Sequence, residues 1–76
     1  MSKVKNAVSF KVGQKIQYFR KVQGVSVEYL AEMVSLSPQQ IRKYEAGDSK
    51  IKIDILFDIS LALGVPLLTL ACESEF

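Results

Sequence analysis

The sequence has no histidine and no tryptophan, and its only cysteine is Cys72. A single cysteine excludes a disulfide within the chain, and the absence of histidine excludes a zinc site built from the Cys and His side chains of one chain. Catalysis needs a nucleophile, a proton-transferring group or a metal cluster, and the carboxylate pair Asp54 and Asp58 fits a solvated helix face instead. We therefore expect no enzyme activity, no bound metal and no cofactor.

Long apolar runs are missing as well. No run approaches the roughly 18 to 20 residues that span a bilayer, and residues 1–6 lead into no hydrophobic segment with a cleavage site. We expect a cytoplasmic protein with no membrane contact and no evident small-molecule substrate. Hydrophobic residues make up 49% of the 76 residues, which is enough for one small globular domain. We assign a flexible basic N-terminal arm to residues 1–8, the domain to 9–71 and a C-terminal tail to 72–76.

Positive charge is absent from the last third of the chain. Residues 1–52 carry all ten Lys and Arg against four acidic residues, a net charge of +6. Residues 53–76 carry four acidic residues and no basic one, a net charge of −4. A basic half fits a surface that faces phosphates, although uneven charge is also common in small soluble domains.

Turn residues divide the chain into short helices. Gly24, Gly47 and Gly64 each follow a helical stretch, where a left-handed residue commonly closes the last turn. Ser26 and Ser37 can cap the helices that follow them, and Pro38 suits the first helical position. The helices expected in this way cover residues 9–23, 26–35, 38–46, 53–63 and 66–71. No strand pattern competes with them, so we predict an all-α bundle of five helices.

Each expected helix has an apolar face at spacings of three and four residues, as helices packed on a core do. The inward residues are Val12, Ile16, Phe19 and Gln23, then Leu30, Ala31 and Val34, then Ile41, Tyr44 and Glu45, and finally Ile53, Leu56, Ile59, Ser60 and Leu63. The residues largely outside these faces include Lys11, Lys15 and Lys21, and in the third helix Gln39, Arg42, Lys43 and Ala46. The third helix should therefore present a polar, partly basic face to solvent.

The second and third helices, joined by a short turn, have the layout of a helix-turn-helix. Residues 12–70 as a whole resemble the phage-repressor and Cro family of helix-turn-helix domains. The resemblance rests on Val12-Gly13, Ile16, Phe19-Arg20, Val25-Ser26, Glu28, Leu30-Ala31-Glu32, the segment SPQQIRKYEAG at 37–47, Leu56, Ile59 and Leu63-Gly64-Val65. It implies a compact repressor-like bundle that binds double-stranded DNA as a homodimeric transcriptional regulator at a two-fold symmetric operator. The helix at about 38–45 would then lie in the major groove.

The resemblance also implies roles for individual residues. The expected base-reading residues are Ser37, Pro38, Gln39 and Lys43, with Gln40 and Arg42 close to the same surface. The expected phosphate contacts are Ser26, Lys50 and Lys52, with Lys11, Lys15, Lys3 and Lys5 as further candidates that are equally well explained as solvated lysines. Arg20 and Glu45 are expected to form a structural ion pair. The alternative is that residues 39–43 are an ordinary solvated helix face.

Three positions depart from the family pattern. Val27 stands where many members carry a glutamine that contacts phosphate, so one anchoring contact is missing. Ser35 stands where the turn often has glycine, and a left-handed conformation there would cost serine on the order of 1 kcal/mol. Pro38 replaces a hydrogen-bonding residue and can offer only an apolar face, for example to a thymine methyl group. These departures bear on the DNA sequence that is read rather than on the fold.

The C-terminal part has more apolar residues than a domain of this size can easily cover. Leu61 lies on the Asp54/Asp58 side of its helix, and Leu67, Leu68 and Leu70 follow in a short segment. These four leucines are expected to form a two-fold interface, whereas the alternative is that the last helix caps the core of the monomer. A rival function is that of an antitoxin or accessory protein, which would bind a protein partner through the same surface.

Overall fold

The computed structural model describes residues 7–71. They form five α-helices and no strand: α1 (Ala7–Val22), α2 (Val27–Met33), α3 (Pro38–Ala46), α4 (Ile53–Leu63) and α5 (Leu67–Ala71). This confirms the predicted all-α, five-helix fold, with α1 beginning two residues before the expected Ser9. The arm residues 1–6, the tail at 72–76 and with it Cys72 lie outside the described residues.

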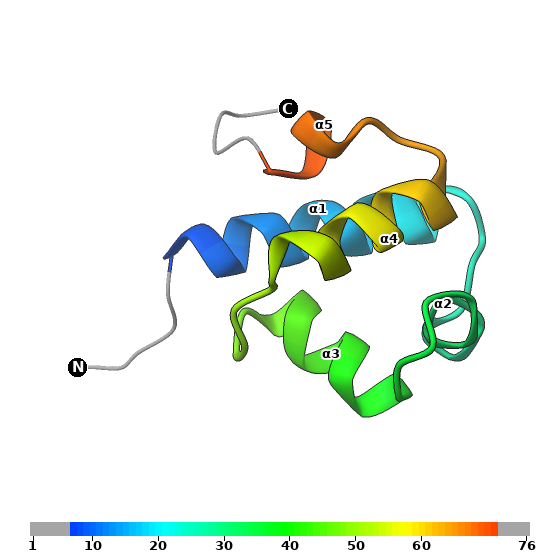
Figure 1. The fold of residues 1–76 in the computed structure, drawn as a ribbon. Coiled ribbons are helices and arrows are strands. Elements are labelled where there is room, and N and C mark those ends of the chain that lie inside the picture. Colours follow the sequence, from blue (N-terminus) through cyan, green and yellow to red (C-terminus); the bar gives the residue numbers. More distant parts are fainter. Residues whose placement is uncertain (1–6, 72–76) are drawn as a thin grey trace.

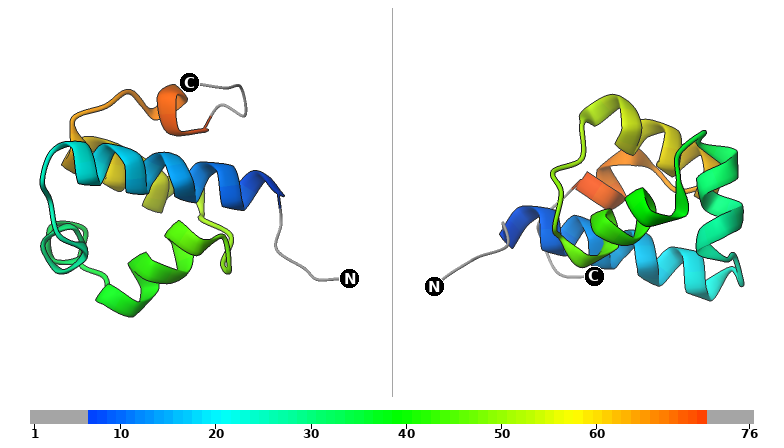
Figure 2. Two further views of the ribbon diagram at one scale, coloured as in Figure 1. Left: turned by 180° about the vertical axis from the view of Figure 1, so that it is seen from behind. Right: turned by 90° about the horizontal axis from the view of Figure 1, so that it is seen from below.

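Helix α1 is the central element of the bundle. It contacts α3, α4 and α5, whereas α2 contacts α3 and α4. Helix α5 lies on one side of α1 and α4, and the α2–α3 pair lies on the other (Figure 1). The views from behind and from below show the same arrangement, with α3 crossing beneath α1 (Figure 2). The two helices of the expected helix-turn-helix therefore share one side of the molecule.

The core takes at least one fully buried apolar side chain from every helix. Ile16, Leu30, Ile41, Ile59 and Leu70 are each 0% exposed. Burying one such side chain contributes roughly 1.5–3 kcal/mol, so these residues anchor the five helices to one another. The inward faces predicted for α2 and α3 are confirmed, as are Val12, Ile16, Leu56, Ile59, Ser60 and Leu63.

Three residues differ from the predicted faces. Lys15 is only 4% exposed, because α1 is covered by helices on several sides. Ile53 is 64% exposed, because it is the first residue of α4 and lies at the edge of the core. Gln23 is exposed, but its Nε2 donates a hydrogen bond of 2.6 Å to the Leu63 carbonyl and so ties the end of α1 to the end of α4.

The helix ends follow the predicted local chemistry. The Ser26 hydroxyl accepts a hydrogen bond of 3.0 Å from the Tyr29 N–H, and the Ser37 hydroxyl accepts one of 3.1 Å from the Gln40 N–H. Gly47 closes α3 in the left-handed conformation, with φ 79°. Ser35 also adopts a positive φ of 60°, between α2 and α3. The turn thus retains the geometry for which glycine is the usual residue.

The left-handed backbone at Ser35 makes a stability prediction. Ser35→Gly should raise the free energy of unfolding by about 1 kcal/mol, because glycine has no Cβ to oppose this conformation. Thermal unfolding followed by circular dichroism should show a melting temperature higher by roughly 4–8 °C for a domain of this size. Ser49→Gly is the control, because Ser49 lies in the loop after α3 and its own φ is not positive. A stability that falls with Ser35→Gly would contradict the strained turn.

Candidate nucleic-acid interface

The α2–α3 unit is held together through its turn. The Leu36 N–H donates a hydrogen bond of 2.9 Å to the Ala31 carbonyl, and the Val34 N–H donates one of 3.1 Å to the Leu30 carbonyl. Val34 and Leu36 are half-buried and pack against the core. The turn is therefore a fixed connection between the two helices.

Helix α3 has two chemically different faces. Ile41, Tyr44 and Glu45 are buried against the rest of the domain. Of the six residues expected to read bases, the ones that lie exposed are Ser37, Gln39, Arg42 and Lys43, whereas Pro38 and Gln40 are half-buried. The structure thus brings these six residues together on one short helix and its cap, with polar groups directed away from the core.

The expected phosphate-contacting residues flank this helix. Ser26 is exposed at the N-terminus of α2, and Lys50 and Lys52 are exposed in the loop between α3 and α4. Lys11 is exposed on α1, but Lys15 is buried and is not available to a phosphate in this arrangement. Lys3 and Lys5 lie outside the described residues.

Arg20 and Glu45 form a buried ion pair between α1 and α3. Arg20 Nε lies 2.6 Å from Glu45 Oε2, and a second nitrogen lies 3.0 Å from Oε1. Their side chains are only 10% and 5% exposed. The hydrogen bond to Glu45 raises the pKa of Arg20 above its ordinary value, although desolvation opposes the shift. Both residues are occupied with each other and face away from the polar side of α3.

Two glutamines on α1 strengthen this contact, and sequence reasoning did not identify them. Gln14 Nε2 donates to the Glu45 carbonyl at 3.1 Å, and Gln17 Nε2 donates to Glu45 Oε1 at 3.4 Å. Their spacing of three residues predicts that they lie on the same face of α1. That both side chains bind Glu45 follows only from the packing of α3 against α1. The C-terminal end of α3 is therefore held by three side chains of one helix.

Gly13 permits the backbones of α1 and α3 to touch. A Cβ at this position would overlap the Tyr44 carbonyl oxygen and lie 2.8 Å from the Glu45 carbonyl oxygen. Any larger residue would push the two helices apart. The close approach and the ion pair thus fix α3 on α1 at the same place.

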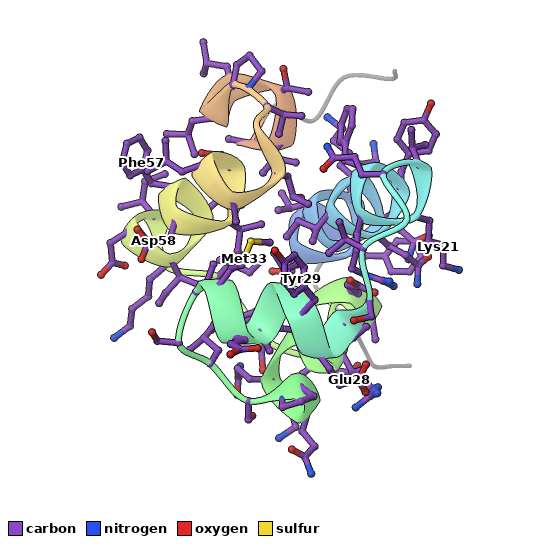
Figure 3. All side chains as sticks on the ribbon, turned by 90° about the vertical axis from the view of Figure 1, so that its right-hand side faces the viewer. Lys21, Glu28, Tyr29, Met33, Phe57 and Asp58 are labelled. Atoms are coloured by element: carbon purple, nitrogen blue, oxygen red, sulfur yellow. The ribbon has the colours of Figure 1, made fainter. Side chains whose placement is uncertain are left out.

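A second ion pair links α2 to α3 at the surface. An Arg42 guanidinium nitrogen lies 2.7 Å from Glu28 Oε2, and the two side chains are 55% and 63% exposed. The backbone N–H of Glu28 itself and the Arg42 hydrogen bond lower the pKa of the Glu28 carboxyl, so it stays ionised. Glu28 lies at the lower right of Figure 3, away from Phe57 and Asp58 of α4. Sequence analysis missed this pair because its partners are 14 residues apart on different helices.

The four leucines of the expected dimer interface do not share one environment. Leu61 is 65% exposed and Leu68 is 77% exposed, whereas Leu67 is half-buried against the core. Leu70 is 0% exposed, so its place in the interface is corrected: it packs inside the monomer, where α5 covers α1 and α4. Met33 and Phe57 are further exposed apolar residues (Figure 3). Met33 and Leu61 line a groove between α2 and α4 together with Val34, Ser35, Asp58 and Ala62.

Within residues 7–71 no three His, Cys, Asp or Glu side chains come together as they would around a metal ion. None of the helices in that range is long and apolar enough to cross a membrane.

The chain is similar to one known protein family and to several known proteins. A family model described as helix-turn-helix, HTH_3, matches residues 16–70. The uncharacterized transcriptional regulator in the ATPase CF(0) region of Rhodospirillum rubrum is 41% identical over 56 residues, which are 74% of this chain and 52% of that protein. A regulator from Sinorhizobium medicae is 37% identical over 82% of this chain and 45% of its own length. The chain thus spans about half the length of the curated relatives that it matches.

Solved structures show the same fold. The controller protein C.AhdI from Aeromonas hydrophila has a TM-score of 0.82 at 25% identity, covering 86% of this chain and 98% of that one. The N-terminal DNA binding domain of SinR from Bacillus subtilis has a TM-score of 0.79 at 28% identity, covering 88% and 99%. A structure of SinR in complex with DNA also matches, with a TM-score of 0.73 at 30% identity over 78% of this chain and 95% of that one.

The buried ion pair makes a stability prediction. Glu45→Gln should lower the free energy of unfolding by about 3 kcal/mol, because it leaves the Arg20 guanidinium buried without a counter-charge. Replacing both residues with methionine should recover most of this loss, since neither charge then remains. Urea denaturation of the wild type, the single variant and the double variant checks both statements. A single-variant loss below about 1 kcal/mol would instead be the behaviour of a solvent-exposed pair.

Proposed function

Because the chain belongs to the helix-turn-helix family HTH_3, we propose that it acts as a sequence-specific regulator of transcription that places α3 in the major groove of double-stranded DNA. The observation that carries the proposal is the two-sided character of α3. Its inner face is buried and packs against α1, whereas Gln39 and Lys43 on its outer face are exposed to solvent. A helix of this size fits the major groove, and its polar face is where base edges would lie. Action on DNA implies a cytoplasmic location.

The side chains on this face suit the readout of base edges. A glutamine amide can form two hydrogen bonds with an adenine edge, and a lysine can address guanine O6 and N7, each good pair being worth roughly 1–3 kcal/mol of discrimination. Gln39, Gln40 and Lys43 are the residues proposed for these contacts. Ser37 and Pro38 would contribute a hydroxyl and an apolar surface at the start of α3.

Phosphate contacts on both sides of α3 would set its position on the duplex. Ser26 lies before α2, and Lys50 and Lys52 lie after α3, so these residues bracket the reading face along the chain. The apolar side chain of Val27 cannot form a hydrogen bond at the start of α2. We therefore propose that orientation depends chiefly on the two lysines and on Ser26.

The exposed leucines support assembly into a homodimer. Leu61 and Leu68 expose most of their apolar surface, and Leu67 lies half-buried beside Leu68 on α5. A two-fold interface through α4 and α5 would cover this surface and separate the two α3 helices by about 34 Å, one turn of DNA. The operator would then be an inverted repeat.

The same exposed leucines also favour a second candidate function. Together with the groove between α2 and α4 they could hold a protein partner, as an antitoxin or accessory protein would. The two functions differ in what they require of DNA. A regulator discriminates between sequences, whereas a protein-binding module need not.

Selection from a random duplex library separates these functions. At about 150 mM salt, where non-specific binding is weak, we expect an enriched inverted repeat that binds at least ~1,000-fold more tightly than a scrambled duplex. Fluorescence anisotropy measures both Kd values, and analytical ultracentrifugation of the complex gives its stoichiometry. Absence of enrichment would favour the protein-partner function, and enrichment of a single half-site bound by one chain would contradict the dimer.

The two classes of lysine should respond differently to mutation. Lys43→Ala should change the selected sequence and lower discrimination, because a base contact is lost. Lys50→Ala should weaken binding to every duplex and reduce the slope of log Kd against log salt by about one, because a phosphate contact is lost. Lys21→Ala, an exposed lysine at the end of α1, is the control. An unchanged selected site for Lys43→Ala would contradict the assigned reading face.

A further inference from the structure

The ion pair between Glu28 and Arg42 has no clear role in folding. Both side chains are more than half exposed, and ion pairs so exposed add little to stability because water and salt screen them. The α2–α3 unit is already held by its turn and by the buried residues Leu30 and Ile41. We therefore look for the role of this pair in the binding of DNA by this surface.

Glu28 places a negative charge on the proposed DNA-binding surface, where it opposes the binding of phosphate. It stands in the first turn of α2, two residues after Ser26, and reaches the face of α3 that the proposed function sets against DNA. An ionised carboxylate there repels phosphate unless a cation neutralises it. Arg42 supplies that cation, and in doing so it is no longer available to DNA.

We propose that Glu28 is a specificity-determining residue that withholds the Arg42 guanidinium from the phosphates of non-cognate DNA. This inference rests on the proposed function of sequence-specific DNA binding. In a non-cognate complex no base contacts fix α3, so an unpaired arginine on it is free to reach a phosphate, whereas base contacts on the cognate duplex hold α3 in one position and Arg42 away from the phosphates. With Glu28 at 2.7 Å, a phosphate contact must first break an existing charge-assisted hydrogen bond, so the net gain is small.

The proposal assigns Arg42 a different role from Lys43. Lys43 is exposed on the same face and has no ion-pair partner among the described residues, so it is free to meet a base edge. Arg42 remains paired with Glu28 in both cognate and non-cognate complexes. Base preference should therefore depend on Lys43 and not on Arg42.

The test compares Glu28→Gln with a matched control, Glu32→Gln. Glu32 is exposed one turn further along α2 and has no ion-pair partner within residues 7–71, so its removal changes net charge alone. Anisotropy titrations would use the library-selected duplex and a scrambled duplex of equal length, over a range of salt concentrations. Circular dichroism verifies that each variant is folded.

We expect Glu28→Gln to tighten binding to the scrambled duplex by about fivefold at 150 mM salt, which is the gain from one additional phosphate contact. The slope of log Kd against log salt should steepen by about one, while affinity for the selected duplex changes by less than about twofold. Glu32→Gln should produce neither change. Arg42→Gln should leave the selected sequence unaltered. In the Arg42→Gln background Glu28→Gln should tighten binding to both duplexes alike, because only the repulsion between the unpaired carboxylate and phosphate is then removed.

Each other result overturns the inference. Unchanged scrambled-duplex affinity for Glu28→Gln would mean that Arg42 is not withheld, and equal effects of the two glutamate variants would mean general charge repulsion. A new base preference for Arg42→Gln would make Arg42 a base reader. If the wild type itself fails to discriminate between the duplexes, the proposed function fails and this inference with it, whereas the other outcomes leave that function intact.

Discussion

The contact between α1 and the C-terminal end of α3 is the constraint on which the rest of the structure depends. Gly13 lets the two backbones meet, and Glu45 is held there by Arg20 and Gln17. Because the polar face of α3 lies opposite this contact, its direction in space is set by residues that face the interior. In this protein, the side chains that orient α3 are different from the side chains that are proposed to contact the bases.

The two ion pairs illustrate how burial decides the role of a charge. Breaking the buried Arg20–Glu45 pair would cost roughly 3–5 kcal/mol, a large part of the 5–15 kcal/mol that stabilises a typical domain. The exposed Arg42–Glu28 pair adds little to stability, because water and salt screen it. Folding therefore requires the first pair. The second pair can be changed with little effect on the fold, so it is suited to adjusting the affinity of this surface for DNA.

Local signals explain why most of the fold could be predicted. Ser37, Pro38 and Gly47 mark the two ends of α3 through caps and a left-handed residue, which depend only on neighbours in the chain. The burial of Lys15 and Leu70 was not predictable in this way, since it depends on which helices cover α1 and α5. The Glu28–Arg42 pair depends on the angle between α2 and α3, which no periodicity encodes. Candidate residues on one helix face could be named, but their partners on other helices could not.

The most direct test of the central claim is an NMR titration of the 15N-labelled chain with its selected duplex. If α3 is held by α1 and reads the major groove, the largest amide shifts should fall at residues 37–43 and around Ser26, with Lys50 and Lys52 also affected. The amides of Gly13 and Arg20 should shift little, because the α1–α3 contact is retained on binding. Shifts concentrated on α4 and α5, with α3 unchanged, would contradict the account.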